Sequence, residues 1–510
     1  MWLTHIVERN KQCFGDRTAL VDANRSLTWA EFHDRSLCIA HSLSRRGIGQ
    51  GDRVAFLSAD RIDVLEVYFA LARLGALFVP INHSLTTSEI ADVCESTGVV
   101  AIFGESSLLN RHPVLPVDLR IAFESEEFSD LLAELSTNQF RDLPQVSDDA
   151  LAAIISTSAT TGRAKGVTVD YASFRAISLG WLAATQPAAD TVIVNCCPLY
   201  HGSLTLSFAY MAAGATLVLV PGFKPQMVLA AIEKNRATHI WLVPQMLHFL
   251  LKTSSFSTAN LSSLREILYG AAPMPAETLK HAVNQLDCGF RQVYGLTEVG
   301  GPFATLGPGE HPSSVDRTEL IAAGRVIPGM SVRVLDREGI EVEPNAVGEI
   351  CVRGPGIMRG YWQDAAATNE IIIRDWVHTG DLGFIDENGL ITLVDRIKNI
   401  IIRAGQNIYP SEVERILNSH PKVQDSAVVG VPDADYGEVP FAYVVTEENI
   451  SEVDILYHVS NYLAPYKRPR NIEFIEQIPR NAAGKIVKRL LPASKFGSTP
   501  NVQIDTAQRP

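Results

Sequence analysis

Cysteine is scarce in this sequence and follows no pattern that indicates a structural role. The 510 residues include seven cysteines, an odd number, spread along the chain without a C-x-x-C pair. Their number and spacing predict neither a disulfide framework nor a zinc site. We therefore expect a protein of the reducing cytoplasm.

Basic residues are too few to balance the acidic ones. The chain has 44 lysines and arginines against 57 aspartates and glutamates, a formal net charge of −13. This balance argues against nonspecific binding to nucleic acid or to an anionic membrane. The deficit is uneven, because 30 basic and 44 acidic residues precede Arg396, whereas residues 396–495 hold 13 and 12. Residues 396–495 thus have the character of a separate domain that faces an anionic ligand.

Long uncharged runs are also rare. One span, residues 203–223, is free of charge and mostly apolar. Gly214 and Pro221 interrupt it, so we predict a buried helix, a turn and a buried strand rather than a membrane span. At the start of the chain, Glu8 and Arg9 stand where a signal peptide needs an apolar core, and no such peptide is expected.

The periodicity of the apolar residues indicates an α/β fold. A predicted strand at 53–57, a helix from Ile62 and a strand at 77–81 follow one another, which is typical of a parallel sheet covered by helices. Residues 105–147 show little periodicity, and variable surface structure is expected there. Residues 324–354 alternate like a small antiparallel β subdomain, and residues beyond Asp395 indicate a compact α+β unit. A chain of this length exceeds what one core supports.

The segment at residues 156–167, S-T-S-A-T-T-G-R-A-K-G-V, has the composition of a phosphate-binding loop and follows a predicted buried strand. Small residues let backbone N–H groups approach an oligophosphate, hydroxyls donate further hydrogen bonds, and Lys165 adds a cation. The spacing is not that of ordinary P-loop NTPases, since only two residues separate Gly162 from Lys165. On this segment alone, an ordinary polar loop is the alternative.

Five further motifs follow in a fixed order and carry a resemblance to a known family. With the loop, they resemble the adenylate-forming enzymes: acyl-CoA synthetases, the adenylation domains of peptide synthetases, and luciferases. The resemblance extends from about Leu27 to Leu491. The motifs are Y-G-L-T-E at 294–298, T-G-D at 379–381, D-R-I-K at 395–398, G-Q-N-I-Y-P at 405–410 and P-R-N-A-A-G-K at 479–485.

The resemblance implies two domains joined by a hinge at Asp395. Residues 1–394 would form a large AMP-binding domain of mainly parallel sheets with a small β subdomain, and residues 395–495 a small, mobile α+β domain. In the family this domain rotates after adenylation, so that the hairpin at 405–407 replaces Lys485 at the site. Residues 496–510 are polar, and we expect a disordered tail there.

The resemblance also implies which residues bind ATP and Mg²⁺. Glu298 matches the position that binds Mg²⁺, and Thr297 the position that contacts the α-phosphate. Lys485 matches a mobile lysine that bridges the carboxylate and the α-phosphate, and His201 matches a histidine of the acyl pocket. Taken singly, these would be a capping carboxylate, a solvated lysine and a structural histidine. The β- and γ-phosphates are expected at Thr157, Ser158, Thr160, Thr161, Gly162 and Lys165.

The adenosine would lie at a second group of motif residues. Asp381 matches an aspartate that accepts from both ribose hydroxyls, and Arg396 is expected to reach the ribose from the other side of the hinge. By itself, Asp381 after a glycine would be an ordinary turn residue. An aromatic face and free backbone groups would hold the base. The expected adenine site is Gly270, Ala271, Ala272, Tyr294 and Gly295.

Three alanines depart from the family pattern. Most relatives have glycine where this chain has Ala159 and proline where it has Ala164, so a lower ATP affinity without loss of function is expected. Many CoA-using relatives have a glycine in place of Ala404, beside the pantetheine tunnel, and the added methyl group is expected to narrow that tunnel. Four cations are available for the phosphates of CoA, unless they form an ordinary solvated surface: Arg403, Lys467, Arg468 and Arg470.

The expected function is ATP-dependent activation of a fatty or aryl carboxylic acid as its acyl-adenylate, followed by transfer to the thiol of CoA. The alternative keeps the adenylation and passes the acyl group to an amine or to a carrier-protein thiol. A non-catalytic nucleotide-binding homologue is disfavoured, because the lysines, carboxylates and arginine of the motifs are all retained. The expected partners are small molecules, with no nucleic acid and no membrane, and nothing in the sequence specifies an oligomeric state.

Overall fold

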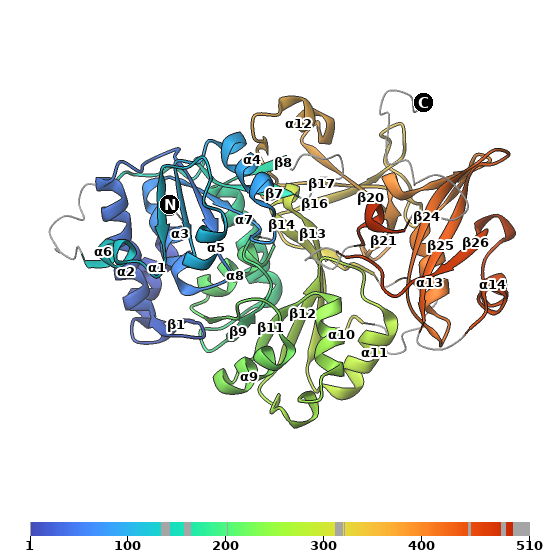
Figure 1. Ribbon diagram of the computed structural model, residues 1–510, viewed down its shortest axis with the longest axis horizontal. Coiled ribbons are helices and arrows are strands. Elements are labelled where there is room, and N and C mark those ends of the chain that lie inside the picture. The colour runs from blue at the N-terminus through green and yellow to red at the C-terminus, as the bar shows by residue number, and fades with distance from the viewer. Residues whose placement is uncertain are drawn as a thin grey trace.

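The computed structural model describes residues 2–133, 143–157, 165–200, 202–311, 320, 322–446, 450–480 and 486–492. These residues form two large sheets covered by helices, a smaller antiparallel sheet, and a C-terminal α+β domain (Figure 1). In this part of the chain, every helix is too short or too polar to cross a membrane.

The first large sheet has seven strands in the order β18-β8-β7-β4-β3-β5-β6. Pairing is parallel from β7 to β6, whereas β8 and β18 are antiparallel to their neighbours. The strands are β3 (Arg53–Leu57), β4 (Leu77–Pro80), β5 (Ala101–Gly104), β6 (Leu119–Ala122), β7 (Leu151–Thr157), β8 (Lys165–Asp170) and β18 (Gly360–Tyr361). The helices between them are α3 (Ile62–Leu74), α4 (Thr87–Thr97), α5 (Ser106–Arg111), α6 (Glu126–Ala133) and α7 (Tyr171–Thr185).

The second large sheet has nine strands in the order β15-β14-β13-β12-β11-β9-β10-β1-β2. Its centre is parallel, and antiparallel strands close both edges. The strands are β1 (Thr18–Val21), β2 (Ser26–Thr28), β9 (Val192–Asn195), β10 (Thr216–Leu219), β11 (His239–Leu242), β12 (Glu266–Gly270), β13 (Gly289–Leu296), β14 (Gly301–Leu306) and β15 (Arg325–Val326). The helices are α1 (Trp2–Phe14), α2 (Trp29–Arg45), α8 (Ser203–Ala212), α9 (Pro225–Asn235), α10 (Pro244–Lys252) and α11 (Ala276–Gln285).

One core joins the two sheets, because α7 of the first sheet packs against α8 of the second. The rings of Phe174 and Phe208 meet edge to face there, with centroids 5.6 Å apart. Both side chains are fully buried, as is Trp181, whose indole N–H donates to the Pro302 carbonyl at 2.7 Å. Large aromatic side chains of this kind bury much apolar area and hold the sheets in one orientation.

The third sheet and the C-terminal domain follow one another in the chain, and Figure 1 shows them side by side. The third sheet is wholly antiparallel, and its last strand leads into the C-terminal domain. Its elements are β16 (Ser331–Leu335), β17 (Gly348–Arg353), α12 (Ala365–Ile371), β19 (Ile372–Ile373), β20 (Trp376–Ile385) and β21 (Ile391–Arg396). The domain contains β22 (Ile401–Arg403), β23 (Gln406–Ile408), α13 (Pro410–Asn418), β24 (Val423–Asp433), β25 (Gly437–Thr446), α14 (Glu452–Ser460) and β26 (Asn471–Phe474).

The predicted fold class is confirmed, and one expectation about local structure is wrong. The uncharged span forms α8, a turn at Gly214 with φ of 83°, and β10, as predicted. Residues 105–147, however, were expected to be variable surface structure, and their described part contains α5, β6 and α6, with Ile121 and Leu131 fully buried. These elements have four to eight residues, so they are too short to show a helical or strand period in the sequence.

Candidate active site

Asp381 lies between the third sheet and the second large sheet. It is on β20, directly opposite Arg396 of β21, and its side chain is almost wholly buried. One carboxylate oxygen, Oδ1, lies 2.8 Å from Nε of Arg396, and the other, Oδ2, accepts from the Tyr294 hydroxyl at 2.8 Å. Burial, and after it the charge of Asp381, raise the pKa of Tyr294 well above its usual value. Each carboxylate oxygen can accept a second hydrogen bond, so capacity is left for two hydroxyl groups.

The expected adenine residues lie beside this carboxylate, on the neighbouring strands β12 and β13. A side chain at Gly270 would approach the Val293 carbonyl to 2.3 Å, so the close pairing of these strands requires glycine there. Ala271 follows the end of β12 with φ of 66°, and this backbone conformation turns the chain away from the sheet. Its side chain is exposed. The ring of Tyr294 packs against Phe303 at 4.9 Å between centroids. Gly295 has no room for a side chain either, because Gly301 O would lie at 2.2 Å.

Lys165 and Glu298, the residues expected to serve the phosphates and Mg²⁺, are connected through a residue that the motifs did not indicate. Thr157 and Lys165 are partners at the end of the β7–β8 hairpin. Nζ of Lys165 lies 4.9 Å from the ring centroid of Tyr361, and the Tyr361 hydroxyl donates to Oε1 of Glu298 at 3.0 Å. Burial, and next the charge of Glu298, raise the pKa of Tyr361. Glu298 and Thr297 are in the 3-10 helix η3 (Thr297–Val299) and are half-buried.

Six of the predicted site residues lie outside the part of the chain that the structure describes. Their roles stay predictions. They are Ser158, Thr160, Thr161, Gly162, His201 and Lys485.

The residues that precede His201 are held by the buried carboxyl group of Asp60, which follows β3. Oδ1 of Asp60 accepts from the Leu199 N–H at 3.0 Å, and Oδ2 lies 3.4 Å from the side-chain nitrogen of Asn195. Burial raises the pKa of Asp60 to about 7. Next to it, the Tyr200 hydroxyl donates to Asn82 at 3.2 Å. The residues before His201 are thus fixed by hydrogen bonds from the first large sheet.

Asp395 holds both sides of the expected hinge. Its Oδ1 accepts from the Arg396 N–H at 2.6 Å and from the Asn399 side chain at 3.1 Å. Its Oδ2 accepts from the Ser411 N–H, in the first turn of α13, at 2.8 Å. A carboxylate at a helix N-terminus is a favourable placement, because the first N–H groups have no partner in the helix. One side chain therefore connects β21 to the first helix of the C-terminal domain.

The four cations considered for CoA are all engaged within the C-terminal domain. Arg403 donates to the Tyr466 carbonyl at 2.8 Å and stacks over Tyr436, and Arg468 donates to two further carbonyls. Lys467 is paired with Glu412 at 2.8 Å and Arg470 with Asp433. They do not form a free basic surface. Beside them, Ala404 has φ of 48°, a conformation that favours glycine.

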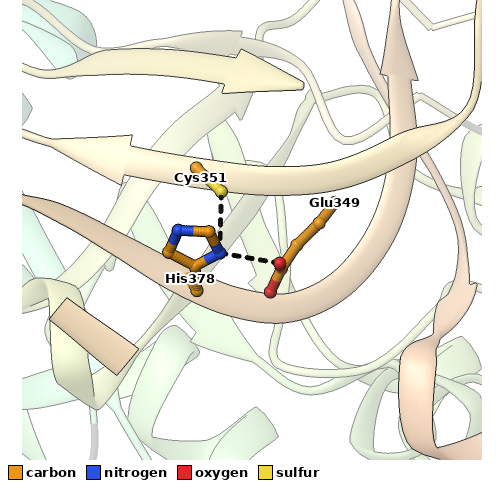
Figure 2. A group of neighbouring side chains, drawn as sticks. All are labelled: Glu349, Cys351 and His378. Carbon is orange, nitrogen blue, oxygen red and sulfur yellow. Dashed lines mark hydrogen bonds and ion pairs between the residues drawn. The ribbon is translucent and has the colours of Figure 1, made fainter. Parts of the chain in front are cut away.

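Glu349 supports the part of β20 that carries Asp381, and the sequence motifs did not indicate it. Its Oε1 accepts from the Gly380 N–H at 2.9 Å, and Nδ1 of His378 lies 2.8 Å from its Oε2 (Figure 2). Thr379 donates to the Ile350 carbonyl at 2.6 Å and accepts from the Asp381 N–H at 3.1 Å. The backbone before Asp381 is therefore fixed before any ligand binds.

Comparisons with known proteins identify the family of this chain. The sequence profile of the AMP-binding enzyme family matches residues 7–362, and that of the AMP-binding enzyme C-terminal domain matches residues 412–485. The chain belongs to the AMP-binding enzyme family. It is an ATP-dependent ligase that activates a carboxylic acid and releases AMP.

Similar members of this family differ in the acceptor that their names state. A fatty acid–[acyl-carrier-protein] ligase, ScoC of Streptomyces coeruleorubidus, is 33% identical over 94% of this chain and 94% of the relative. A 2-succinylbenzoate–CoA ligase of Bacillus cereus is 32% identical over 93% and 95%. Among solved structures, the amide bond synthetase McbA of Marinactinospora thermotolerans has a TM-score of 0.86 and 30% identity, covering 95% of this chain and 98% of that one. Members that resemble this chain thus include enzymes whose names state an acyl-carrier protein, CoA or an amide bond.

Proposed function

We propose that this enzyme activates a fatty or aryl carboxylic acid as its acyl-adenylate and passes the acyl group to the thiol of CoA. The observation that carries the first half is the arrangement of Tyr294, Asp381 and Arg396, where a buried carboxylate is held from both sides. A carboxylate fixed in this way accepts from the two ribose hydroxyls without further ordering. Arg396 follows the hinge residue, so the ribose site joins the large domain to the small one.

Lys165 and Glu298 are proposed to serve the triphosphate. Lys165 supplies a positive charge for the β- and γ-phosphates. Glu298 fits Mg²⁺, because this cation prefers oxygen ligands and only Oε1 of the carboxylate accepts the Tyr361 hydroxyl. When bound there, Mg²⁺ would neutralise charge on the phosphoryl oxygens. Tyr361 contacts both residues, because Nζ of Lys165 lies over its ring and its hydroxyl donates to the carboxylate of Glu298.

In the first half-reaction, a carboxylate oxygen of the acid attacks the α-phosphorus, and the bond to the pyrophosphate leaving group breaks. Negative charge collects on the phosphoryl oxygens, and Lys485 is proposed to neutralise it while it holds the carboxylate. In the second half-reaction the thiol sulfur attacks the acyl carbon, the thiol proton is lost, and AMP leaves. The small domain is proposed to turn about Asp395 between these steps.

The second candidate keeps the adenylation and uses an amine or a carrier-protein thiol as the acceptor. Two observations favour it. The four cations considered for the phosphates of CoA are already engaged in hydrogen bonds and ion pairs, and Ala404 places a methyl group where many CoA-using relatives have none. The names of ScoC and McbA fit this candidate, and that of the succinylbenzoate ligase fits the first.

The deciding experiment measures AMP and pyrophosphate release over a panel of fatty and aryl acids, with no acceptor, with CoA, with a carrier protein, or with mixed amines. AMP turnover that rises only with CoA establishes the proposal and identifies the acid. Turnover that responds to an amine or to the carrier and ignores CoA establishes the second candidate. No pyrophosphate release with any acid contradicts both.

A further inference from the structure

Three potential metal ligands of different kinds meet on one face of the third sheet. Glu349 and Cys351 are two residues apart on β17, so their side chains point to the same face, and His378 is the partner of Cys351 on β20. Figure 2 shows the three side chains turned toward one another. Their ligand atoms, Oε, Sγ and Nδ1, all lie within 4.8 Å of each other.

One donor–donor distance fits a zinc centre as it stands, and a second fits after a small adjustment. In a tetrahedral zinc centre with bonds of about 2.0–2.3 Å, neighbouring donor atoms are about 3.3–3.7 Å apart. Nδ1 of His378 is 3.5 Å from Sγ of Cys351, which already fits, and 2.8 Å from Oε2 of Glu349, which must open by about half an ångström. A glutamate side chain reaches that displacement by small changes in its torsion angles.

The surroundings leave a cation both attracted and accessible. Among the described residues, no lysine or arginine forms an ion pair with Glu349; its partners are Gly380 and His378. Cys351 is fully buried, whereas 18% of the Glu349 side chain and 20% of the His378 side chain are exposed. A cation can therefore enter past the carboxylate and the imidazole and keep a water molecule as its fourth ligand.

We propose that Glu349, Cys351 and His378 bind one Zn²⁺ ion, and that this ion and a nucleotide at Asp381 weaken each other's binding. A thiolate with an imidazole selects zinc over magnesium, which takes oxygen ligands. The thiol proton of Cys351 is released to solvent as the sulfur–zinc bond forms, and His378 binds through Nδ1 with its proton on Nε2. The spacing of the cysteines in the sequence does not predict this site, because its ligands come from two strands, β17 and β20.

The coupling follows from the short connection between the two sites. His378 is three residues before Asp381 on the same strand, and Glu349 holds Gly380 in between. When Oε2 of Glu349 moves away from Nδ1 to admit the ion, Oε1 of the same carboxylate moves with it, and its hydrogen bond to the Gly380 N–H is disturbed. Linkage requires that zinc and AMP reduce each other's affinity by the same factor. We expect about 10-fold, a coupling of about 1.4 kcal/mol.

The first test titrates the metal-free, full-length enzyme with Co²⁺, a spectroscopic substitute for Zn²⁺, without nucleotide. We expect a thiolate-to-cobalt charge-transfer band that saturates at one equivalent, and zinc that displaces the cobalt. Cys351→Ala should remove the band and weaken zinc binding by about 100-fold, whereas Cys94→Ala, at another buried cysteine, should change neither. A band that persists in Cys351→Ala, or zinc binding equal in all three proteins, overturns the site.

A second variant covers the case in which Cys351→Ala fails to fold. Glu349→Gln keeps an oxygen for the Gly380 N–H and loses the charge, so zinc binding should weaken about 10-fold with the fold retained. Zinc binding equal to that of the wild-type enzyme overturns the role of Glu349. For the coupling, AMP is titrated calorimetrically with and without saturating zinc. An AMP affinity that zinc leaves unchanged overturns the coupling. The cobalt and AMP titrations both measure binding without catalysis, so their results do not depend on the proposed acceptor.

Discussion

The ribose end and the phosphate end of the candidate site are held in different ways. At the ribose end, a buried carboxylate has a partner on each oxygen, from two different sheets, and the backbone before it is fixed by Glu349 and Thr379. At the phosphate end, Lys165 faces an aromatic ring and Glu298 has one hydroxyl partner. The residues proposed to bind the adenosine are therefore fixed in place without a ligand. The charged groups proposed to serve the phosphates are held by fewer contacts than the carboxylate of Asp381.

The largest effects should separate binding from catalysis at these two ends. Lys485→Ala is expected to reduce the rate of adenylate formation by about 10²–10³ and to leave ATP affinity nearly unchanged, because its charge is needed mainly in the transition state. Pyrophosphate exchange measures the rate, and calorimetry measures the affinity. Lys488→Ala, which removes a neighbouring lysine bonded to the Val428 carbonyl, is the control. Near-normal pyrophosphate release in Lys485→Ala contradicts the assignment.

At the ribose end, Asp381→Ala should instead weaken the binding of ATP and of AMP by about 10²-fold, since two hydrogen bonds to a charged group are lost. Tyr294→Phe keeps the carboxylate and removes one of its donors, so it should weaken binding by less than about 10-fold. Both affinities are measured by calorimetry. Asp381→Ala with unchanged AMP affinity would place the ribose elsewhere.

A pH effect is expected at the acyl side of the site, where Asp60 holds the loop before His201. Its pKa is raised from 3.8 to about 7, so the folded state binds the proton more tightly than the unfolded state does. The contribution of Asp60 to the free energy of unfolding should therefore fall as pH rises from about 4 to about 7. Asp60→Asn removes this slope, and its stability relative to wild type should increase by on the order of 2–4 kcal/mol between pH 5 and pH 8. Denaturant titrations at both pH values measure it, and a constant difference contradicts it.

At the phosphate end, Tyr361→Phe tests whether the hydroxyl orients Glu298. The hydrogen bond is lost while the ring beside Lys165 stays, so the Mg²⁺ concentration for half-maximal activity should rise about 5-fold. Tyr361→Leu removes the ring as well and should additionally raise the KM for ATP. The two variants are compared in magnesium titrations of AMP release. A Tyr361→Phe variant that behaves like the wild-type enzyme would show that the hydroxyl has no role, and identical behaviour of the two variants would show that the ring has none.

The smallest effect is expected at Ala404, outside both ends. Ala404→Gly relieves the positive φ of 48° and should stabilise the protein by about 0.5–1 kcal/mol. If the methyl group narrows the CoA tunnel, CoA-dependent AMP release should also rise a few-fold. Ala404→Ser keeps the Cβ atom and serves as the control. A gain in stability without any change in CoA dependence would confine the role of Ala404 to the turn.

The sequence predicts the ribose end better than the phosphate end, and the reason is local. In the fold, the strand at Arg53–Leu57 agrees residue for residue with its prediction. At the ribose end, Asp381 and Arg396 lie in sequence motifs and on adjacent strands. Tyr361, by contrast, reaches Lys165 only because β18, two residues long, pairs with β8. Two residues show no period, so neither the strand nor the role of its tyrosine is predictable. The role of Glu349 is not predictable for a similar reason, because its partners His378 and Gly380 lie on the neighbouring strand β20.

The pairing of β18 with β8 also bears on how the chain is completed during synthesis. Thr168 is the partner of Gly360, and its hydroxyl donates to the Gly360 carbonyl at 2.7 Å across 192 positions of sequence. Contacts so distant in sequence form late, because a long loop must close first. A nascent chain can thus assemble the parallel part of the first sheet early. It leaves the edge of β8 open until residue 361 has emerged from the ribosome, and until then that edge is exposed to unwanted strand pairing.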